Sequence, residues 1–341
     1  MRGVLLVASD PIFELHDTGR HHPENAGRLG AVNEGIAAAG LADAIVPIPV
    51  RDATRAELEL VHPGAYLDAL AAKCALGRGH LDADTPTSID SYRVAVTAAG
   101  TSIAALEMLR AGDGDAAFLA LRPPGHHARP SQGMGFCLLN NVAIAASSLA
   151  AVGERVLVVD IDAHHGNGTQ DTFFTDGRVF YVSFHEWPLY PGTGRHDEIG
   201  KGDGEGTTCN LPLPAGATGD IYLRALDEVV EPLVEAFAPT WVLISAGFDA
   251  HRADPLTGLG LSAGDYRAIT ARIARWAKPG RIAAFLEGGY DLGALCDSVA
   301  ASLPCLLDEN APVQPDERET SGGPGFIVVE AVADMWSTRR G

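Results

Sequence analysis

Short apolar runs that alternate with longer helical stretches constrain the fold of this chain more than any other feature. The runs are rich in Val, Ile, Leu and Ala, as in strands covered on both faces, and they comprise Val4–Ala8, Ala116–Leu121, Val156–Asp160, Val179–Phe184, Trp241–Ala246 and Ile282–Leu286. Between several of them lie segments with the apolar spacing of packed helices, namely Ser91–Leu109, Asn140–Ala151, Ile221–Phe237 and Ala263–Trp276. This alternation predicts an α/β fold with a mainly parallel sheet and helices on both faces.

The third apolar run leads directly into a cluster of potential metal ligands. Val156–Asp160 is followed by Ile161, Asp162, Ala163 and His164. Polar residues at this point lie at the carboxyl end of a strand, where open α/β sheets bind their ligands. Asp162 and His164 are two residues apart, so in an extended segment both side chains leave the same side. Oxygen and nitrogen donors that converge on one point suit a divalent ion such as zinc.

Four other apolar runs also end in polar clusters. These are Arg122-Pro-Pro-Gly-His126-His127, Ser183-Phe184-His185, Ser245-Ala-Gly-Phe-Asp249 and Glu287-Gly-Gly-Tyr290. In a parallel sheet all of these ends face one edge, so residues far apart in sequence converge on one crevice. A single strand-end Asp or His-His pair is more often a turn or core residue, and the shared placement is what indicates a site.

The residues at these strand ends predict hydrolysis of an amide. Asp162, His164 and Asp249 supply three protein ligands and leave a position open for water, as in catalytic zinc sites. His126 and His127 then stand beside that water as acid–base groups.

Three further residues complete this chemistry. Asp160 and Asn167 are candidate orienting partners for the two imidazoles, and a carboxylate partner favours the imidazolium more than an amide does. Tyr290 follows two glycines and is placed to donate its hydroxyl to a developing oxyanion.

Composition excludes several other classes of protein. The formal net charge of −19 argues against a nucleic-acid partner, because binding to phosphates relies on clustered Lys and Arg. We expect no membrane span, since no segment approaches about twenty consecutive apolar residues. The five cysteines form no CxxC pair and are expected to be reduced, in a cytoplasmic protein.

The chain is expected to form one catalytic domain over residues 1–308. Residues 309–341 form a connector rich in Pro, Gly and charge, followed by a tail that docks as a strand or helix or frays. Two long loops, 20–28 and 188–206, shape the rim of the site or contribute to a possible homo-oligomer.

The motifs resemble those of the histone deacetylase superfamily, on its class II and bacterial deacetylase-like side. The resemblance extends from the His-Pro-Glu-Asn-Ala-Gly-Arg stretch near the start to about Leu307. It rests on the strings Arg-Pro-Pro-Gly-His126-His127-Ala, Gly133-Met-Gly-Phe136-Cys-Leu-Leu-Asn140-Asn141, Asp160-Ile-Asp162-Ala-His164-His165-Gly-Asn167-Gly-Thr-Gln170, Ser245-Ala-Gly-Phe-Asp249 and Leu286-Glu-Gly-Gly-Tyr290. It implies an arginase/deacetylase-like fold and one catalytic zinc.

The resemblance assigns further roles residue by residue. Asp162, His164 and Asp249 match the zinc ligands, His127 matches the general base of the tandem pair with His126, and Tyr290 matches the tyrosine that stabilises the transition state. The implied substrate-binding residues are the tunnel walls Phe136 and Tyr190, the adjacent Gly135, the rim residue Asp84 and the gatekeeper position Leu256. The implied potassium ligands are Asp160, Asp162, His164, Ser183 and Phe184.

Several alternatives remain open at this point. The expected substrate is an acylated lysine, and an acetylpolyamine or a small acylated metabolite is the alternative; Leu256 stands where a polyamine-selective relative has Glu. Asn167 stands where class I members carry Asp, which favours class II. A binuclear-manganese ureohydrolase is less favoured, because Gly166 and His251 replace the Asp residues expected there. A catalytically silent module that binds acylated ligands is disfavoured because Tyr290 and both histidines are present.

Overall fold

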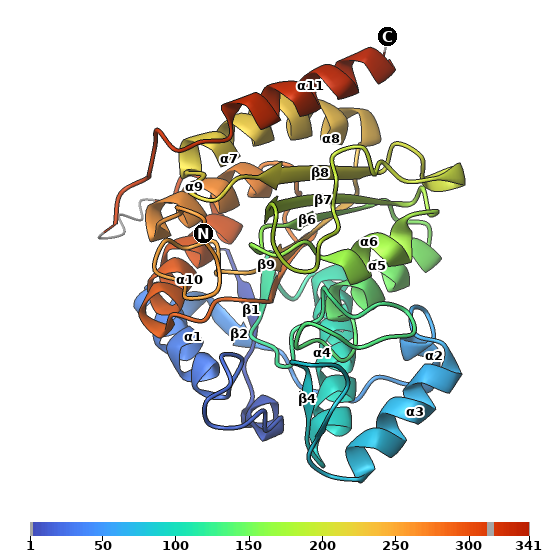
Figure 1. The fold of residues 1–341 in the computed structure, drawn as a ribbon. Helices are drawn as coiled ribbons and strands as arrows, with labels where there is room; N and C mark the ends of the chain where they lie inside the picture. The colour runs from blue at the N-terminus through green and yellow to red at the C-terminus, as the bar shows by residue number, and fades with distance from the viewer. Residues whose placement is uncertain (1–2, 312–316, 341) are drawn as a thin grey trace.

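A parallel sheet of eight strands forms the centre of the protein (Figure 1). The computed structural model describes residues 3–311 and 317–340. The strands follow the spatial order β2-β1-β5-β10-β9-β6-β7-β8, and every neighbouring pair is parallel. Their bounds are β1 (Leu5–Ala8), β2 (Ile45–Pro47), β5 (Ala116–Leu119), β6 (Val156–Asp160), β7 (Val179–Glu186), β8 (Thr208–Leu213), β9 (Trp241–Ala246) and β10 (Ile282–Leu286). The predicted α/β fold with a mainly parallel sheet is confirmed.

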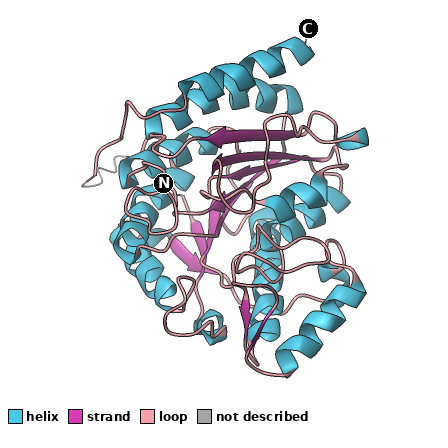
Figure 2. Cartoon of the chain, viewed as in Figure 1, coloured by secondary structure: helices cyan, strands magenta, loops and turns pink. Residues whose placement is uncertain are grey.

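Helices cover both faces of this sheet (Figure 2). One face carries α2 (Arg55–Leu58), α3 (Gly64–Ala75), α4 (Ser91–Ala111), α5 (Asn141–Ala151) and α6 (Asn167–Phe173). The other carries α1 (Gly27–Ala38), α7 (Gly219–Ala225), the π-helical turn η4 (Leu226–Val230), α8 (Glu231–Phe237), α9 (Ala263–Ala274), α10 (Leu292–Leu307) and α11 (Phe326–Arg340). The central strands are therefore buried on both sides.

Smaller elements complete the chain. They are the short helical turns η1 (Pro11–Leu15), η2 (Ala42–Ala44) and η3 (Gly202–Gly204), and an antiparallel pair of strands, β3 (Gly79–His80) and β4 (Pro86–Thr87).

All six apolar runs of the sequence are strands, whereas the two outermost strands, β2 and β8, were not predicted. The predicted helix over Ile221–Phe237 is confirmed as the continuous sequence of α7, η4 and α8. The C-terminal tail, for which strand, helix and fraying were open, forms α11 and packs against β8 and η4. Residues 312–316 of the connector lie outside the described residues.

Polar caps begin the helices that frame the site. The Asn140 side chain accepts a hydrogen bond from the Ala143 amide at the start of α5, at 2.9 Å, and the Asp291 side chain accepts one from the Ala294 amide at the start of α10, at 2.8 Å. Asp291 is the residue after Tyr290, so the cap of α10 also fixes the chain just beyond the end of β10.

One helix is long and apolar enough to cross a membrane by length and composition, contrary to the expectation from the sequence. This helix is α4, but 72% of the apolar window is buried inside the protein. It packs against α5 and the strands β1 and β5, as a core helix does.

Candidate active site

The register of the central strands brings the predicted residues to one edge of the sheet. Asp160, the last residue of β6, pairs with Ser183 of β7 on one side and with Ser245 of β9 on the other. The segments that follow β5, β6, β9 and β10 therefore leave the sheet at the same level, and these strands lie side by side.

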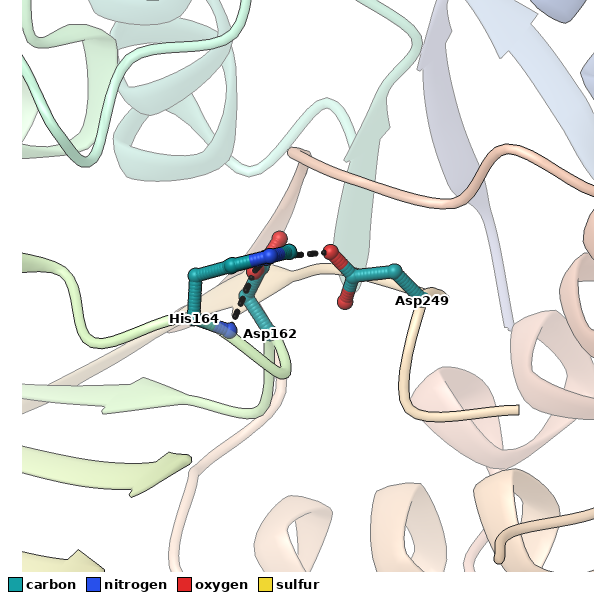
Figure 3. Close-up of side chains that lie close together, drawn as sticks. All are labelled: Asp162, His164 and Asp249. Atoms are coloured by element: carbon teal, nitrogen blue, oxygen red, sulfur yellow. Dashed lines mark hydrogen bonds and ion pairs between the residues drawn. The ribbon is translucent and has the colours of Figure 1, made fainter. Parts of the chain in front are cut away.

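Asp162, His164 and Asp249 converge at this edge (Figure 3). One ligand atom from each residue lies within 4.8 Å of those of the other two. The His164 Nδ1 atom is 3.2 Å from Asp162 Oδ1 and 2.9 Å from Asp249 Oδ2. Both carboxylates are buried. The three side chains predicted as ligands from separate parts of the sequence thus form one cluster.

The electrostatics of this cluster suit a cation. Burial and the neighbouring Asp162 carboxylate raise the pKa of Asp249 to about 7, because two buried carboxylates cannot readily share one pocket as anions. The backbone also approaches closely at Gly288, where an added Cβ atom would clash with carboxylate oxygens of Asp162 and Asp249. Two carboxylates and an imidazole nitrogen in such a cradle fit a zinc ion, which prefers this donor set.

The tandem histidines lie beside the cluster and have different partners. The His126 Nδ1 atom is 3.0 Å from Asp160 Oδ2, and the His127 Nδ1 atom is 2.8 Å from Asn167 Oδ1. The centroids of the two rings are 4.0 Å apart. Because the Asn167 oxygen accepts, His127 donates from Nδ1 and keeps a lone pair on Nε2.

Burial and the neighbouring charges shift the pKa values of the two imidazoles in opposite directions. Burial acts to lower the pKa of His126, but the Asp162 and Asp160 carboxylates outweigh it and raise this pKa to about 10. Burial together with the charge of His126 lowers the pKa of His127 well below its ordinary value. Near neutral pH His126 is therefore an imidazolium and His127 a neutral base.

Tyr290 follows β10 on a short glycine turn. Its backbone amide donates to Asp254 Oδ2 at 2.7 Å, and the Arg28 guanidinium carbon lies 5.1 Å from its ring centroid. Gly289 has φ of 116°, a backbone conformation that side chains other than hydrogen rarely permit. The Tyr290 side chain therefore leaves a tightly held turn, and its ring centroid lies 5.8 Å from that of Phe136.

Tyr190 contacts the histidines of the site, whereas Phe136 contacts Tyr290. The Tyr190 ring centroid lies 5.2 Å from that of His127 and 6.4 Å from that of His164, edge to face in both cases. Gly135 lies beneath them, because an added Cβ atom there would contact both His127 and Tyr190. Phe136 has φ of 68°, and its amide donates to Thr85 Oγ1 at 3.0 Å.

The rim residues lie farther out. The Asp84 carbonyl oxygen is 3.1 Å from His22 Nε2, and the His22 ring packs on Phe136 with centroids 4.6 Å apart. Leu256 is 37% exposed, and its amide donates to Asp254 Oδ1 at 2.9 Å. An apolar, partly exposed side chain thus occupies the position that the sequence predicts as the gatekeeper.

Two of the residues assigned to potassium, Asp162 and His164, belong to the cluster itself, and the other three lie at the end of β6 and within β7. Asp160, Ser183 and Phe184 are fully buried. The Asp162 amide donates to Asp160 Oδ1 at 3.2 Å. Asp160 also pairs with Ser183 of β7 in the sheet, and Phe184 is the next residue of that strand.

Sequence reasoning missed residues that support the site through backbone groups. Glu287 Oε2 accepts from the amides of Gly125 and His126, at 2.7 and 3.1 Å, and burial raises the Glu287 pKa to about 7. Arg28 donates from Nε to the Gly289 carbonyl at 2.7 Å. Glu287 and Arg28 both lie in the sequence strings that resemble the histone deacetylase superfamily, and nothing else in the sequence indicates their supporting role.

Two further histidines of the strand-end segments, His185 and His251, are buried. His185 is fully buried and contacts Ser183 Oγ and the Gly194 carbonyl, each at 2.9 Å. His251 is buried and bonded to Glu317 in the C-terminal segment.

The parallel sheet and its edge cluster define an α/β domain of the arginase and deacetylase type. A solved structure, the crystal structure of the HDA15 HD domain, superimposes with a TM-score of 0.89 at 36% identity, over 98% of this chain and 94% of that one.

The chain belongs to the histone deacetylase family. The family described as "Histone deacetylase domain" matches residues 22–306. A probable deacetylase from Archaeoglobus fulgidus is 40% identical over 287 residues, 82% of this chain and 80% of that protein. A histone deacetylase-like amidohydrolase from Pseudomonas aeruginosa is 39% identical over 240 residues, 69% of this chain and 63% of that protein. Membership in this family supports a hydrolase activity.

Proposed function

We propose that the protein is a zinc-dependent deacetylase of the class II type that removes an acetyl or other short acyl group from an acylated amine, most readily an acyl-lysine. The observation that carries the proposal is the Asp162–His164–Asp249 cluster with a neutral His127 beside it. Bound zinc would lower the pKa of water and polarise the acyl carbonyl.

Different side chains around the cluster then carry out the separate proton transfers. His127 takes a proton from the attacking water on its free Nε2, and the Tyr290 hydroxyl donates to the oxygen on which negative charge develops. Asp160 holds His126 as the charged partner, and Asn167 fixes the tautomer of His127. Protonation of the leaving amine by His127 or His126 completes the cleavage.

The walls of the site support an extended, apolar acyl-amine stem. Tyr190 lies beside His127, Phe136 lies beside Tyr290, and Gly135 packs closely against His127 and Tyr190. At the rim, Asp84 would accept a hydrogen bond from a substrate amide. These contacts favour an acyl-lysine in a polypeptide.

A side chain has no space at Gly166, one of the two positions where a ureohydrolase would supply a further carboxylate. An added Cβ atom on Gly166 would clash with Asp160 Oδ2 and the Tyr181 hydroxyl. His251, the other such position, is bonded to Glu317 at 2.7 Å. Both observations support one catalytic metal.

Metal analysis with a turnover assay tests this proposal. We expect about one equivalent of zinc per chain, by plasma emission, and hydrolysis of a fluorogenic acetyl-lysine amide. A requirement for two equivalents of manganese would instead indicate a ureohydrolase. Absence of turnover with zinc and potassium supplied would favour a silent acyl-ligand binding module.

We also propose that potassium binds Asp160, Asp162, His164, Ser183 and Phe184. Replacement of potassium by a large organic cation in the buffer is expected to lower turnover, with recovery when potassium is added back. Turnover that is independent of every monovalent cation tested would contradict this assignment.

The acetylpolyamine alternative is tested at the gatekeeper position. Leu256→Glu is expected to improve kcat/KM for acetylpolyamines relative to an acetyl-lysine peptide by up to about fivefold, because one exposed ion pair contributes about 0.2–1 kcal/mol. The isosteric control is Leu256→Gln, which adds a polar group without charge. If the wild type already prefers acetylpolyamines, the acyl-lysine assignment is wrong.

We propose a cytoplasmic location. The five cysteines are all free thiols, and four of them are buried, which fits a reducing compartment.

A further inference from the structure

The loop after β9 links the Asp162–His164–Asp249 cluster to Tyr290. This loop, residues 249–261, is called the Asp249 loop here, and it is closed at its base by a bridge between His251 and Leu261. The Arg252 amide donates to the Leu261 carbonyl at 2.8 Å, and the Leu261 amide donates to the Ala250 carbonyl at 3.1 Å. The loop is therefore closed at its base, and it begins with Asp249, a residue of the Asp162–His164–Asp249 cluster.

Two side chains of the Asp249 loop reach the reactive groups. Asp249 enters the cluster, and the Thr257 hydroxyl donates to its carbonyl at 2.5 Å. Asp254 accepts the backbone amides of Tyr290 and Leu256, at 2.7 and 2.9 Å. A displacement of this loop would move a metal ligand and the backbone of Tyr290 together.

A segment near the C-terminus, residues 317–320, is bonded to this loop and is called the strap here. Glu317 Oε2 is 2.7 Å from His251 Nε2 and accepts from the Ala263 amide at 3.2 Å. Glu317 Oε1 accepts from Arg252 at 2.5 Å. The Ala253 amide donates to His251 Nδ1 at 3.1 Å, so the His251 proton is on Nε2 and is donated to Glu317.

The rest of the strap is anchored to the start of α9. The Arg318 carbonyl accepts from the Ser262 hydroxyl at 2.8 Å, and the Thr320 amide donates to Asp265 Oδ1 at 2.9 Å. An added Cβ atom on Gly264 would clash with the strap backbone. The strap thus has a fixed base from which Glu317 reaches the Asp249 loop.

We propose that Glu317 is a positioning residue that acts through His251 to hold the Asp249 loop, and with it Asp249 and Tyr290, in the geometry of the reaction. The strap lies beyond the residues 22–306 that match the family, so the family assignment gives it no role. The effect on turnover rests on the proposed function, whereas the effect on the loop does not.

Glu317→Ala tests this proposal against a matched control. Glu319, two residues away in the strap, pairs with Arg267 at 3.0 Å and makes no contact with the Asp249 loop among the described residues. We expect Glu317→Ala to lower kcat on the order of tenfold with KM little changed, as loss of groups that orient metal ligands does. Glu319→Ala is expected to retain wild-type kcat.

Glu317→Gln separates the two contacts of the carboxylate. The side-chain oxygen of the new glutamine can still accept from His251 and from the Ala263 amide, whereas its NH2 group cannot accept from Arg252. We expect this variant to recover most of the kcat lost in Glu317→Ala. Equal kcat values for Glu317→Ala and Glu319→Ala would overturn the proposal.

Hydrogen exchange provides a readout that does not depend on catalysis. Amides of residues 250–261 are expected to exchange faster in Glu317→Ala than in Glu319→Ala or the wild type, with α4 unchanged. Unchanged exchange in this loop would overturn the strap's role even if turnover were lowered. If the wild type turned over no acylated amine while the exchange difference appeared, the proposed function would fail and the strap assignment would stand.

Discussion

Replacement of His127 by glutamine is expected to lower kcat by about 10²–10⁴-fold, the range that a positioned general base contributes. The physical reason is the neutral state of His127, whose pKa is held well below the ordinary value by burial and by charged His126. Nδ1 is committed to Asn167, so Nε2 is the only basic atom left to take a proton from water. The measurement is kcat with a saturating acetyl-lysine peptide.

The control for this variant is His196→Gln, because His196 is exposed in the loop after β7 and outside the cluster. It should leave kcat unchanged. The zinc content and the thermal unfolding midpoint of His127→Gln should match the wild type, since His127 is not among the cluster residues. A kcat within tenfold of the wild type would rule out His127 as the base.

Asn167→Asp provides a test of the same base through pH. A carboxylate at this position would favour the imidazolium and raise the pKa of His127. The base works only when neutral, so the ascending limb of kcat/KM should move to higher pH, and activity below that limb should be lost. An unmoved limb would mean that His127 is not the group titrating there.

The second large effect is expected from Tyr290→Phe. Loss of one donor to a developing oxyanion costs about 2.7–4 kcal/mol in other enzymes, which corresponds to about 10²–10³-fold in kcat. Tyr290 lies on a turn fixed at the Tyr290 amide by Asp254 and at the Gly289 carbonyl by Arg28. The ring therefore remains in place in the variant, and only the donor is lost.

Tyr92→Phe is the control for removal of a phenol hydroxyl, since Tyr92 lies in the first turn of α4. We expect kcat to be unchanged in that variant. Zinc content should be unchanged in both. Near wild-type turnover by Tyr290→Phe would remove this residue from the mechanism and leave the zinc ion and the histidines to stabilise the oxyanion.

The central strands could be predicted from the sequence because they are buried on both faces and consist of unbroken apolar residues. The edge strands could not. β8 contains Thr208, Asn210 and Pro212, and β2 has only three residues and ends at Pro47, so neither has the unbroken apolar run of an inner strand. Their place in the sheet follows from tertiary pairing with β7 and β1, which no local pattern records.

The candidate site likewise contains residues that could be predicted from the sequence and residues that could not. Residues at the strand ends could be grouped because a parallel sheet brings such ends to one edge. Glu287, Arg28 and Asp254 escaped prediction because they act on backbone amides and carbonyls. Backbone groups occur at every residue, so a bond to one of them leaves no pattern of residue types in the sequence.

The place of β10 in the sheet has a consequence for synthesis of the chain on the ribosome. β10 lies between β5 and β9, although it is the last strand to be made. Until residues 282–286 have emerged, the nascent chain holds two half-sheets whose facing edges are unpaired and open to other chains. Emergence of β10 and the turn after it, rather than binding of metal, therefore sets the earliest moment at which Asp249 and Tyr290 can meet.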